Sequence, residues 1–276
     1  MTDDDISIDE KRVFSSKAGK TEVFVATGVG VVVVDVSGDR IGGFRVDHRC
    51  TARDVAGRDG RIAVATDEDV LLAPGYEPTG FGPAACVGLT DDRVVALGAD
   101  GRVGTLSLDA SLAGDATPWR TVGTVSEGHA VDGRLVATDE GVVRLGGDGL
   151  RPAGLSAVTD VAAAGPFAAT DDGLFYLGNG WMTIDDGPWR VVDAAVDGDR
   201  AHAAGAPGVR RQVGADRGVW DPIDYDLAID GEPVGFAYGD GFVCAVTADG
   251  GFLVDAGDGP RTQALGLRDV GGVAVP

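Results

Sequence analysis

Cysteine and long apolar runs are scarce in this sequence, and each scarcity argues against a class of protein. The 276 residues include three cysteines, Cys50, Cys86 and Cys244, with no C-x-x-C spacing. Such a set does not suit a disulfide scaffold or a zinc module, so we expect reduced thiols in a cytoplasm. The longest aliphatic run, "VVVV" at 31–34, is too short to cross a bilayer, and the acidic start "MTDDDISIDE" lacks the apolar core of a signal peptide.

Positive charge is also scarce. The chain has 23 Lys+Arg against 44 Asp+Glu, a net charge of −21, and its only lysines are Lys11, Lys17 and Lys20. Nucleic-acid binding depends on neutralising phosphates with basic side chains, so we do not expect it. Repulsion on such a surface reaches ~10 Å at 0.1 M salt but ~3 Å at 1 M, and an acidic, lysine-poor surface is typical of salt-loving cells. A surface that recruits a basic partner is the alternative.

Familiar catalytic and cofactor motifs are missing. There is no G-x-S-x-G, H-E-x-x-H or EF-hand pattern. "AGKT" at 18–21 ends like a phosphate-binding loop, but Phe14 stands where that loop needs its first glycine. We therefore expect no cofactor, no metal site and no identifiable catalytic residue.

One short phrase recurs along the chain. "RIAVATDEDV" (61–70), "RLVATDEGVV" (134–143) and "FAATDDGLFY" (167–176) share an apolar run, Ala-Thr, an acidic or glycine turn and a second apolar run. This pattern predicts a β-hairpin. Seven hairpins are predicted, at residues 23–34, 62–73, 94–106, 135–145, 167–177, 201–211 and 243–254.

Each hairpin is flanked by two further strands. A piece rich in Gly and Ala precedes it, and a more polar strand follows, for example "GWMTID" at 180–185. Four antiparallel strands in a repeat of roughly 40 residues form the blade of a β-propeller. The final piece, "RDVGGVAV" (268–275), matches the first-strand piece "RDVAGRD" (53–59), yet no hairpin follows it.

These observations predict an all-β fold: a seven-bladed β-propeller of four-stranded antiparallel blades. Its ring would be closed by the C-terminal strand joining the N-terminal blade, which removes two open sheet edges. Residues 11–276 would form this single domain, and residues 1–10 an acidic disordered N-terminus.

The repeat "L-x-A-T-x-x-G-L" resembles the one found in two-component-regulator-type propellers. With its segments "DHRCTARDVA" and "ATDEDVL", the whole chain resembles a family of β-propeller proteins from halophilic archaea. That resemblance implies the fold and carries no established activity.

Polar residues gather in the loops that lead into the first strands. Those loops share one face of a propeller, so they should converge on one mouth of its channel. Convergent Arg and Asp side chains can bind a small polar ligand, and they can equally form ion pairs between blades. The candidate binding residues are His48, Arg49, Cys50, Arg53, Asp54, Asp160, Asp193, Arg268 and Asp269.

Three other groups have two interpretations each. A Cys50 thiolate with His48 as its base is conceivable, although alternate strand positions point to opposite sides. Acidic hairpin turns such as Asp139-Glu140 are solvated turn residues or a site for a cation or basic partner. The tryptophans are expected at outer positions, where they cap gaps between blades or present a peptide or glycan surface: Trp119, Trp181, Trp189 and Trp220.

We therefore predict a non-enzymatic binding or scaffold module in the cytoplasm of a halophile. Its partner would be a protein or a small polar ligand, with neither nucleic acid nor membrane involved, and the chain would be a monomer. The alternative is an enzyme of the hydrolase or lyase type with its site at the channel mouth, because fold alone does not decide function.

Overall fold

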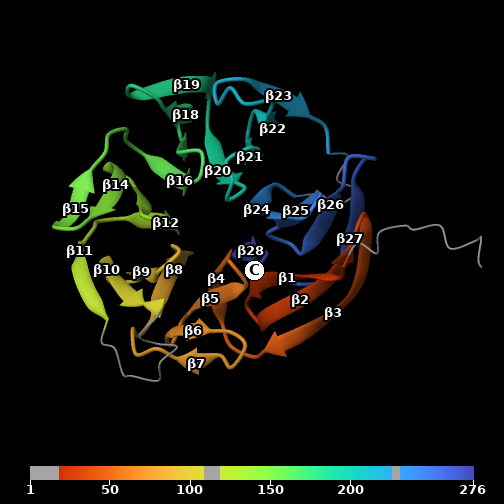
Figure 1. Ribbon diagram of the computed structural model, residues 1–276, viewed down its shortest axis with the longest axis horizontal. Coiled ribbons are helices and arrows are strands. Elements are labelled where there is room, and N and C mark those ends of the chain that lie inside the picture. Colours follow the sequence, from red (N-terminus) through yellow and green to blue (C-terminus); the bar gives the residue numbers. More distant parts are fainter. Residues whose placement is uncertain (1–18, 109–118, 226–230) are drawn as a thin grey trace, which may run out of the picture.

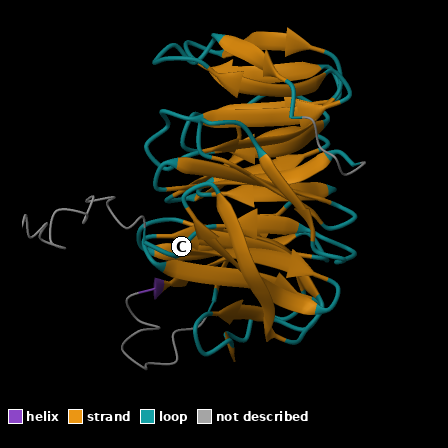
Figure 2. Ribbon diagram, turned by 90° about the vertical axis from the view of Figure 1, so that its right-hand side faces the viewer, coloured by secondary structure: helices purple, strands orange, loops and turns teal. Residues whose placement is uncertain are grey.

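Seven four-stranded antiparallel sheets surround a central channel (Figure 1). The computed structural model describes residues 19–108, 119–225 and 231–276. The predicted seven-bladed β-propeller is confirmed in these residues, and all seven predicted hairpins are present. The proposed acidic segment 1–10 lies outside them. Seen from the side, the loops gather on two opposite faces of the ring (Figure 2).

The blades are numbered along the chain, and each runs from an inner to an outer strand. Blade 1 holds β28 (Gly272–Ala274), β1 (Thr21–Thr27), β2 (Gly30–Ser37) and β3 (Arg40–His48). Blade 2 holds β4 (Ala52–Arg58), β5 (Arg61–Thr66), β6 (Val70–Leu72) and β7 (Glu77–Pro78). Blade 3 holds β8 (Ala84–Leu89), β9 (Arg93–Gly98), β10 (Arg102–Ser107) and β11 (Arg120–Thr124).

The remaining four blades repeat this order. Blade 4 holds β12 (Gly128–Asp132), β13 (Leu135–Thr138), β14 (Gly141–Gly146) and β15 (Gly149–Pro152). Blade 5 holds β16 (Val158–Ala162), β17 (Phe167–Thr170), β18 (Gly173–Leu177) and β19 (Trp181–Asp186). Blade 6 holds β20 (Trp189–Ala194), β21 (Ala201–Gly205), β22 (Gly208–Gln212) and β23 (Trp220–Ile223). Blade 7 holds β24 (Pro233–Gly239), β25 (Phe242–Thr247), β26 (Gly251–Asp255) and β27 (Arg261–Ala264).

The C-terminal strand closes the ring as predicted. β28 pairs antiparallel with β1, with Gly272 opposite Ala26 and Ala274 opposite Phe24. Blade 1 therefore takes its inner strand from one end of the chain and its other three from the other end. This pairing covers the edge of β1 that would otherwise offer unpaired backbone groups.

The threonine of the recurring phrase explains why the phrase recurs. The hydroxyl of Thr138 is buried and donates to the carbonyl oxygen of Gly141 at 2.7 Å, closing the hairpin turn. Thr27 and Thr170 make the same bond to Gly30 and Gly173. Gly141 has φ of 129°, and a Cβ there would lie 2.5 Å from the carbonyl oxygen of Leu155, so this turn requires glycine.

The hydrophobic core is divided among the junctions between blades. Seven buried clusters exist, each combining two neighbouring blades. One example packs Val25 and Val34 of blade 1 against Phe242 and Phe252 of blade 7. The middle strands are therefore apolar on both faces, because each blade is covered on both sides.

The tryptophans do not all lie on outer strands, so one expectation was wrong. Trp181 and Trp220 begin outer strands, and Trp119 packs on Phe81 with ring centroids 4.6 Å apart. Trp189, however, begins the inner strand β20 and is fully buried. The tripeptide "PWR" leads into an outer strand in blade 3 and into an inner strand in blade 6, so the tripeptide alone does not show which strand the tryptophan belongs to. None of the helical structure in the described ranges is long and apolar enough to cross a membrane.

Candidate functional site

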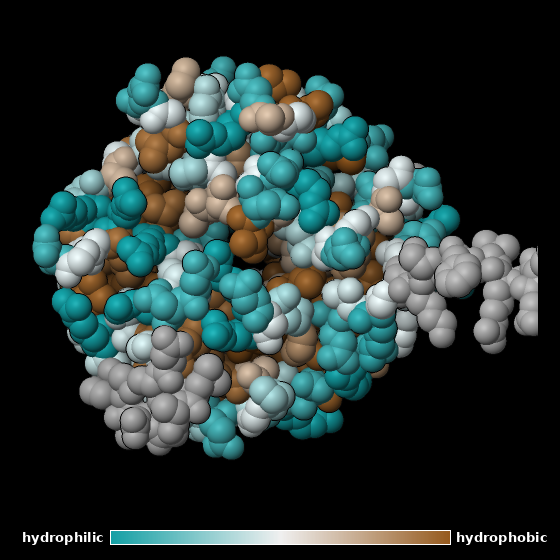
Figure 3. Space-filling view, in the orientation of Figure 1, coloured by the Kyte–Doolittle hydropathy of each residue, from teal (hydrophilic) through white to brown (hydrophobic). Residues whose placement is uncertain are grey.

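The inner strands line a central pocket of about 390 Å³, which opens at the middle of the disc (Figure 3). Six of them carry a bulge one residue after the first pair, as between Ala52 and Asp54 in β4 or Val158 and Asp160 in β16. Because the bulge recurs at one position, the inner strands present their side chains in matching layers.

The outermost layer consists of the bulged residues, which form the rim of the pocket: Arg53, Ala85, His129, Thr159, Arg190 and Val234. The layer below contains Asp54, Cys86 and Asp160. Asp132 and Asp193 lie two residues further along their strands, so they are deeper. The other inner positions are mostly Gly, Ala and Val, as the sequence predicted for converging strands.

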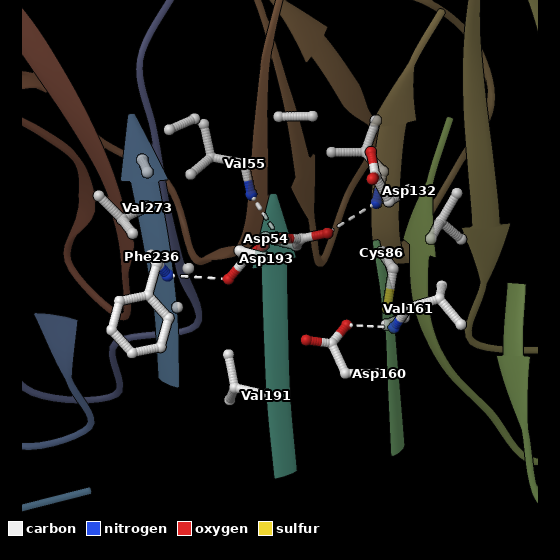
Figure 4. Close-up of a pocket in the computed structure, with 18 of the residues that line it drawn as sticks. Asp54, Val55, Cys86, Asp132, Asp160, Val161, Val191, Asp193, Phe236 and Val273 are labelled. Carbon is white, nitrogen blue, oxygen red and sulfur yellow. Dashed lines mark hydrogen bonds between the residues drawn. The ribbon is translucent and has the colours of Figure 1, made fainter. Parts of the chain in front are cut away.

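Four carboxylates join neighbouring inner strands (Figure 4). Asp54 accepts hydrogen bonds from the amide of Val55 on its own strand, at 2.8 Å, and from the amide of Val87 on the next blade, at 2.9 Å. Asp160 likewise accepts from the amides of Val161 and Val192, both at 2.8 Å.

The two deeper carboxylates make the same kind of contact. Asp132 accepts from the amide of Ala163 on blade 5 at 2.6 Å, and Asp193 from the amide of Phe236 on blade 7 at 2.8 Å. These bonds link blades 2 to 3, 4 to 5, 5 to 6 and 6 to 7. Between blades 3 and 4 a thiol replaces the carboxylate, because Cys86 donates to the carbonyl oxygen of His129 at 3.0 Å.

The channel changes the acidity of these groups. Burial raises the pKa of Asp54 to about 6 and that of Asp193 to about 7, against the hydrogen bonds that favour their charged forms. Burial first, and then the charge of Asp193, raise the pKa of Asp160 well above its ordinary value. Burial also raises the pKa of Asp132. Asp54 and Asp193 therefore exchange protons closer to neutral pH than ordinary surface carboxyls do.

The rim is more open than the layers below it. Arg190 forms an ion pair with Asp171 at 2.6 Å, and His129 lies 2.7 Å from Asp139. Arg53 is exposed, and its guanidinium has no ion pair or hydrogen bond with any residue in the described ranges. Arg53 is therefore the rim side chain that is free to bind another molecule.

The predicted site residues separate into two sets. Arg53, Asp54, Asp160 and Asp193 line one pocket. His48, Arg49, Cys50, Arg268 and Asp269 do not line it.

Of the five outside the pocket, His48 ends β3 and the other four lie in loop positions. Arg49, Arg268 and Asp269 are exposed, and His48 stacks on Tyr76 with ring centroids 4.5 Å apart. Burial and then the charge of Asp67 raise the pKa of the Cys50 thiol, whereas an activated thiol needs a lowered one.

Asp269 is not the counterpart of Asp54, despite the shared "RDV". Asp54 pairs with Ala65 in β5, and the residue that pairs with the equivalent Ala26 in β1 is Gly272. The sequence match is therefore displaced by three residues from the structural one.

Several channel residues were missed by sequence reasoning: Cys86, His129, Asp132, Arg190 and Tyr238. Asp132 is the last residue of β12 and is followed directly by Gly133, so in the sequence it resembles a turn residue. The inner strands of different blades can be aligned with one another by counting residues back from the Thr of each hairpin. The described residues contain no group of three or more His, Cys, Asp or Glu side chains suited to hold a metal ion.

The comparisons with known proteins point to the same fold. A family model described as "Beta-prop_HVO_0234:-like, beta propeller" matches residues 7–276. No curated protein matches the chain. The periplasmic gluconolactonase PpgL of Pseudomonas aeruginosa is 15% identical, with a TM-score of 0.59 over 93% of this chain and 99% of that one.

Two further solved structures are similar. A chain of a nidogen/laminin complex is 9% identical, with a TM-score of 0.56 over 92% of this chain and 98% of that one. A chain in the structure of YCF48 bound to D1 peptide is 12% identical, with a TM-score of 0.55 over 78% and 82% of the two chains. Likeness at these identities concerns the fold alone.

Proposed function

Since the chain belongs to this HVO_0234-like β-propeller family, we propose that it is a non-enzymatic binding or scaffold module that uses the rim of the central pocket. The contrast between the rim and the layers below it supports this proposal. Each of the four carboxylates below accepts a hydrogen bond from a backbone amide of the next blade, so they hold the ring together. The Arg53 side chain above them does not join blades, because it makes no hydrogen bond or ion pair within the described residues.

The partner chemistry follows from the rim. A guanidinium that faces a pocket of about 390 Å³ suits a small polar ligand, or a protein side chain, that carries a carboxylate or another oxyanion. Thr159 and His129 add polar groups at the same level, although the Thr159 hydroxyl already donates to the carbonyl oxygens of Ala169 and Trp189.

Capture by matched variants tests the binding function. Wild type, Arg53→Ala and the control Arg40→Ala, an exposed arginine on blade 1, would be immobilised and exposed to native cell extract at high salt. Bound proteins and small molecules would be identified by mass spectrometry. We expect one species to be recovered by wild type and control but lost with Arg53→Ala, whose melting temperature should be unchanged. Equal recovery by all three would argue against a rim site.

The acidity of the channel favours a second candidate, an enzyme of the hydrolase or lyase type. Asp160 and Asp193 have raised pKa values, and a general acid or base works best when its pKa lies near the working pH. In that case Asp193→Asn should retain capture of the ligand while losing its turnover. A captured ligand that wild type leaves chemically unchanged would favour the binding module.

We also propose a monomer in the cytoplasm of a salt-loving cell. The net charge of −21 and the unpaired thiols Cys50, Cys86 and Cys244 support this. The melting temperature should rise between about 0.1 M and about 2 M KCl, because salt screens the repulsion among excess carboxylates. A flat response would instead suggest that the acidic surface serves a basic partner. Light scattering on a sizing column would report the mass.

A further inference from the structure

Three arginines of blade 4 gather in one depression far from the channel rim. Arg134, Arg144 and Arg151 line a hollow of about 220 Å³ together with Leu145, Gly146 and Gly147. Its residues Gly146 and Gly147 lie at the turn between β14 and β15, which are the two outer strands of blade 4 (Figure 1). A concentration of positive charge is unexpected on a chain whose net charge is −21.

The sheet register places two of these arginines directly opposite each other. Arg144 on β14 faces Arg151 on β15. Like charges at directly opposed positions destabilise a strand pair. One carboxylate relieves this in part, because Asp148 forms an ion pair with Arg151 at 2.8 Å. Arg144 has no ion-pair partner among the described residues, so its charge is available to another molecule.

Among the described residues, Arg134 does not join blade 4 to the next blade, so a structural contact between blades does not account for this arginine. Two arginines at the same turn of other blades reach across to the next blade: Arg61 donates to the carbonyl oxygen of Asp91 at 3.1 Å, and Arg200 to those of Phe242 and Gly239 at 3.1 and 3.2 Å. Arg134 makes no side-chain hydrogen bond or ion pair within the described ranges and borders the hollow instead.

We propose that this hollow binds an oxyanion of the phosphate type. Guanidinium groups bind phosphate oxygens through paired hydrogen bonds, and three arginine residues line the hollow. The turn itself leaves room, since a Cβ at Gly147 would meet no atom within 4 Å. The bound anion offsets the repulsion between Arg144 and Arg151, so binding and stability are coupled.

Phosphate titrations at fixed ionic strength test the site. Melting temperature and calorimetric affinity would be measured with inorganic phosphate, and separately with glycerol 2-phosphate, for wild type, Arg144→Ala and the control Arg40→Ala. Arg40 is an exposed arginine at the β2–β3 turn, the equivalent turn of blade 1. We expect phosphate to stabilise wild type and control, with an affinity reduced by about tenfold or more in Arg144→Ala.

A second readout separates this site from a general effect of charge. Without phosphate, Arg144→Ala should melt at a higher temperature than wild type, because the opposed charges are relieved. Preference for glycerol 2-phosphate would identify a phosphorylated organic ligand, and equal binding would identify free phosphate. The proposal is overturned if wild type responds to neither probe, or if Arg144→Ala and Arg40→Ala weaken binding equally. Arg53→Ala should bind normally, so this result is independent of the channel rim.

Discussion

Two kinds of junction between inner strands differ in what lies between the strands. At the closing seam, where β28 of blade 1 meets β4 of blade 2, backbone lies against backbone. A Cβ at Gly271 would lie 1.9 Å from the carbonyl oxygen of Arg53, and one at Gly57 would lie 2.1 Å from that of Val275. At the four carboxylate junctions an aspartate side chain spans the gap instead.

The two kinds of junction differ in the space they leave for a side chain and in whether pH affects their stability. The two closest seam contacts leave no room for a side chain, so glycine is required at Gly271 and Gly57, and both contacts are with backbone carbonyl oxygens. A carboxylate junction tolerates a wider gap, yet it places an acid in a channel that disfavours its charge. The seam should therefore be sensitive to volume, and the carboxylate junctions to pH.

Removing the seam altogether should have the largest effect. Deletion of residues 267–276 takes away β28, exposes the edge of β1 and opens the core where Val273 packs. We expect loss of cooperative unfolding together with aggregation, followed by circular dichroism on heating and by size-exclusion chromatography. A deletion variant that melts cooperatively at the wild-type temperature would contradict closure by this strand.

Adding one methyl group tests the seam more finely. Gly271→Ala places its Cβ against the Arg53 carbonyl oxygen, which the two strands relieve only by moving apart. We expect a loss of about 3 kcal/mol in the free energy of unfolding, measured by denaturant titration. Gly43→Ala on β3 is the control, because a Cβ there meets no atom within 4 Å. Similar losses in both variants would mean that the seam is no tighter than an outer strand.

Changing pH tests the carboxylate junctions. The pKa of Asp193 is about 7 in the folded protein and starts from 3.8, so the folded state holds this proton more tightly than the unfolded state. The contribution of Asp193 to stability is therefore fully present below pH 4, is lost as pH rises towards 7 and then stays constant. Asp193→Asn should remove roughly 1–3 kcal/mol of this decline between pH 5 and 8. A variant with the same pH profile as wild type would show that Asp193 titrates normally.

The thiol junction should show the smallest effect. Asp54→Ala leaves the buried amide of Val87 without its acceptor, at a cost of about 2 kcal/mol. Cys86→Ala removes a thiol donor to the carbonyl oxygen of His129, and sulfur is the weaker hydrogen-bonding group, so about 1 kcal/mol is expected. Chemical denaturation of both variants gives the order. A larger loss for Cys86→Ala would contradict the expectation that the carboxylate hydrogen bond contributes more to stability than the thiol hydrogen bond.

The hairpins could be predicted from the sequence because their signal is local. Thr138 and Gly141 are three residues apart, and both the hydroxyl bond and the backbone turn depend on that spacing. The number of blades followed directly, and so did closure, because a first strand without a hairpin has one place to pair.

The register of the inner strands could not be obtained in the same way. A bulge shifts six of the seven inner strands by one residue, and three-letter matches such as "RDV" do not reveal it. Asp269 was therefore grouped with Asp54, while Asp132 was overlooked. The carboxylates accept hydrogen bonds from backbone amides on another blade. Every residue type except proline has such an amide, so the sequence does not show which residue will be the partner. Ion pairs with arginine could be expected from residue types, whereas these bonds could not.

The pairing of β28 with β1 also determines how the ring responds to mechanical force. The two strands are antiparallel, so the free end of β28 beyond Ala274 and the start of β1 before Phe24 point the same way. Tension applied between the two chain ends would load their hydrogen bonds one after another, as a zipper opens, and not all at once. The closed ring would thus open at low force when it is pulled by the two ends of the chain.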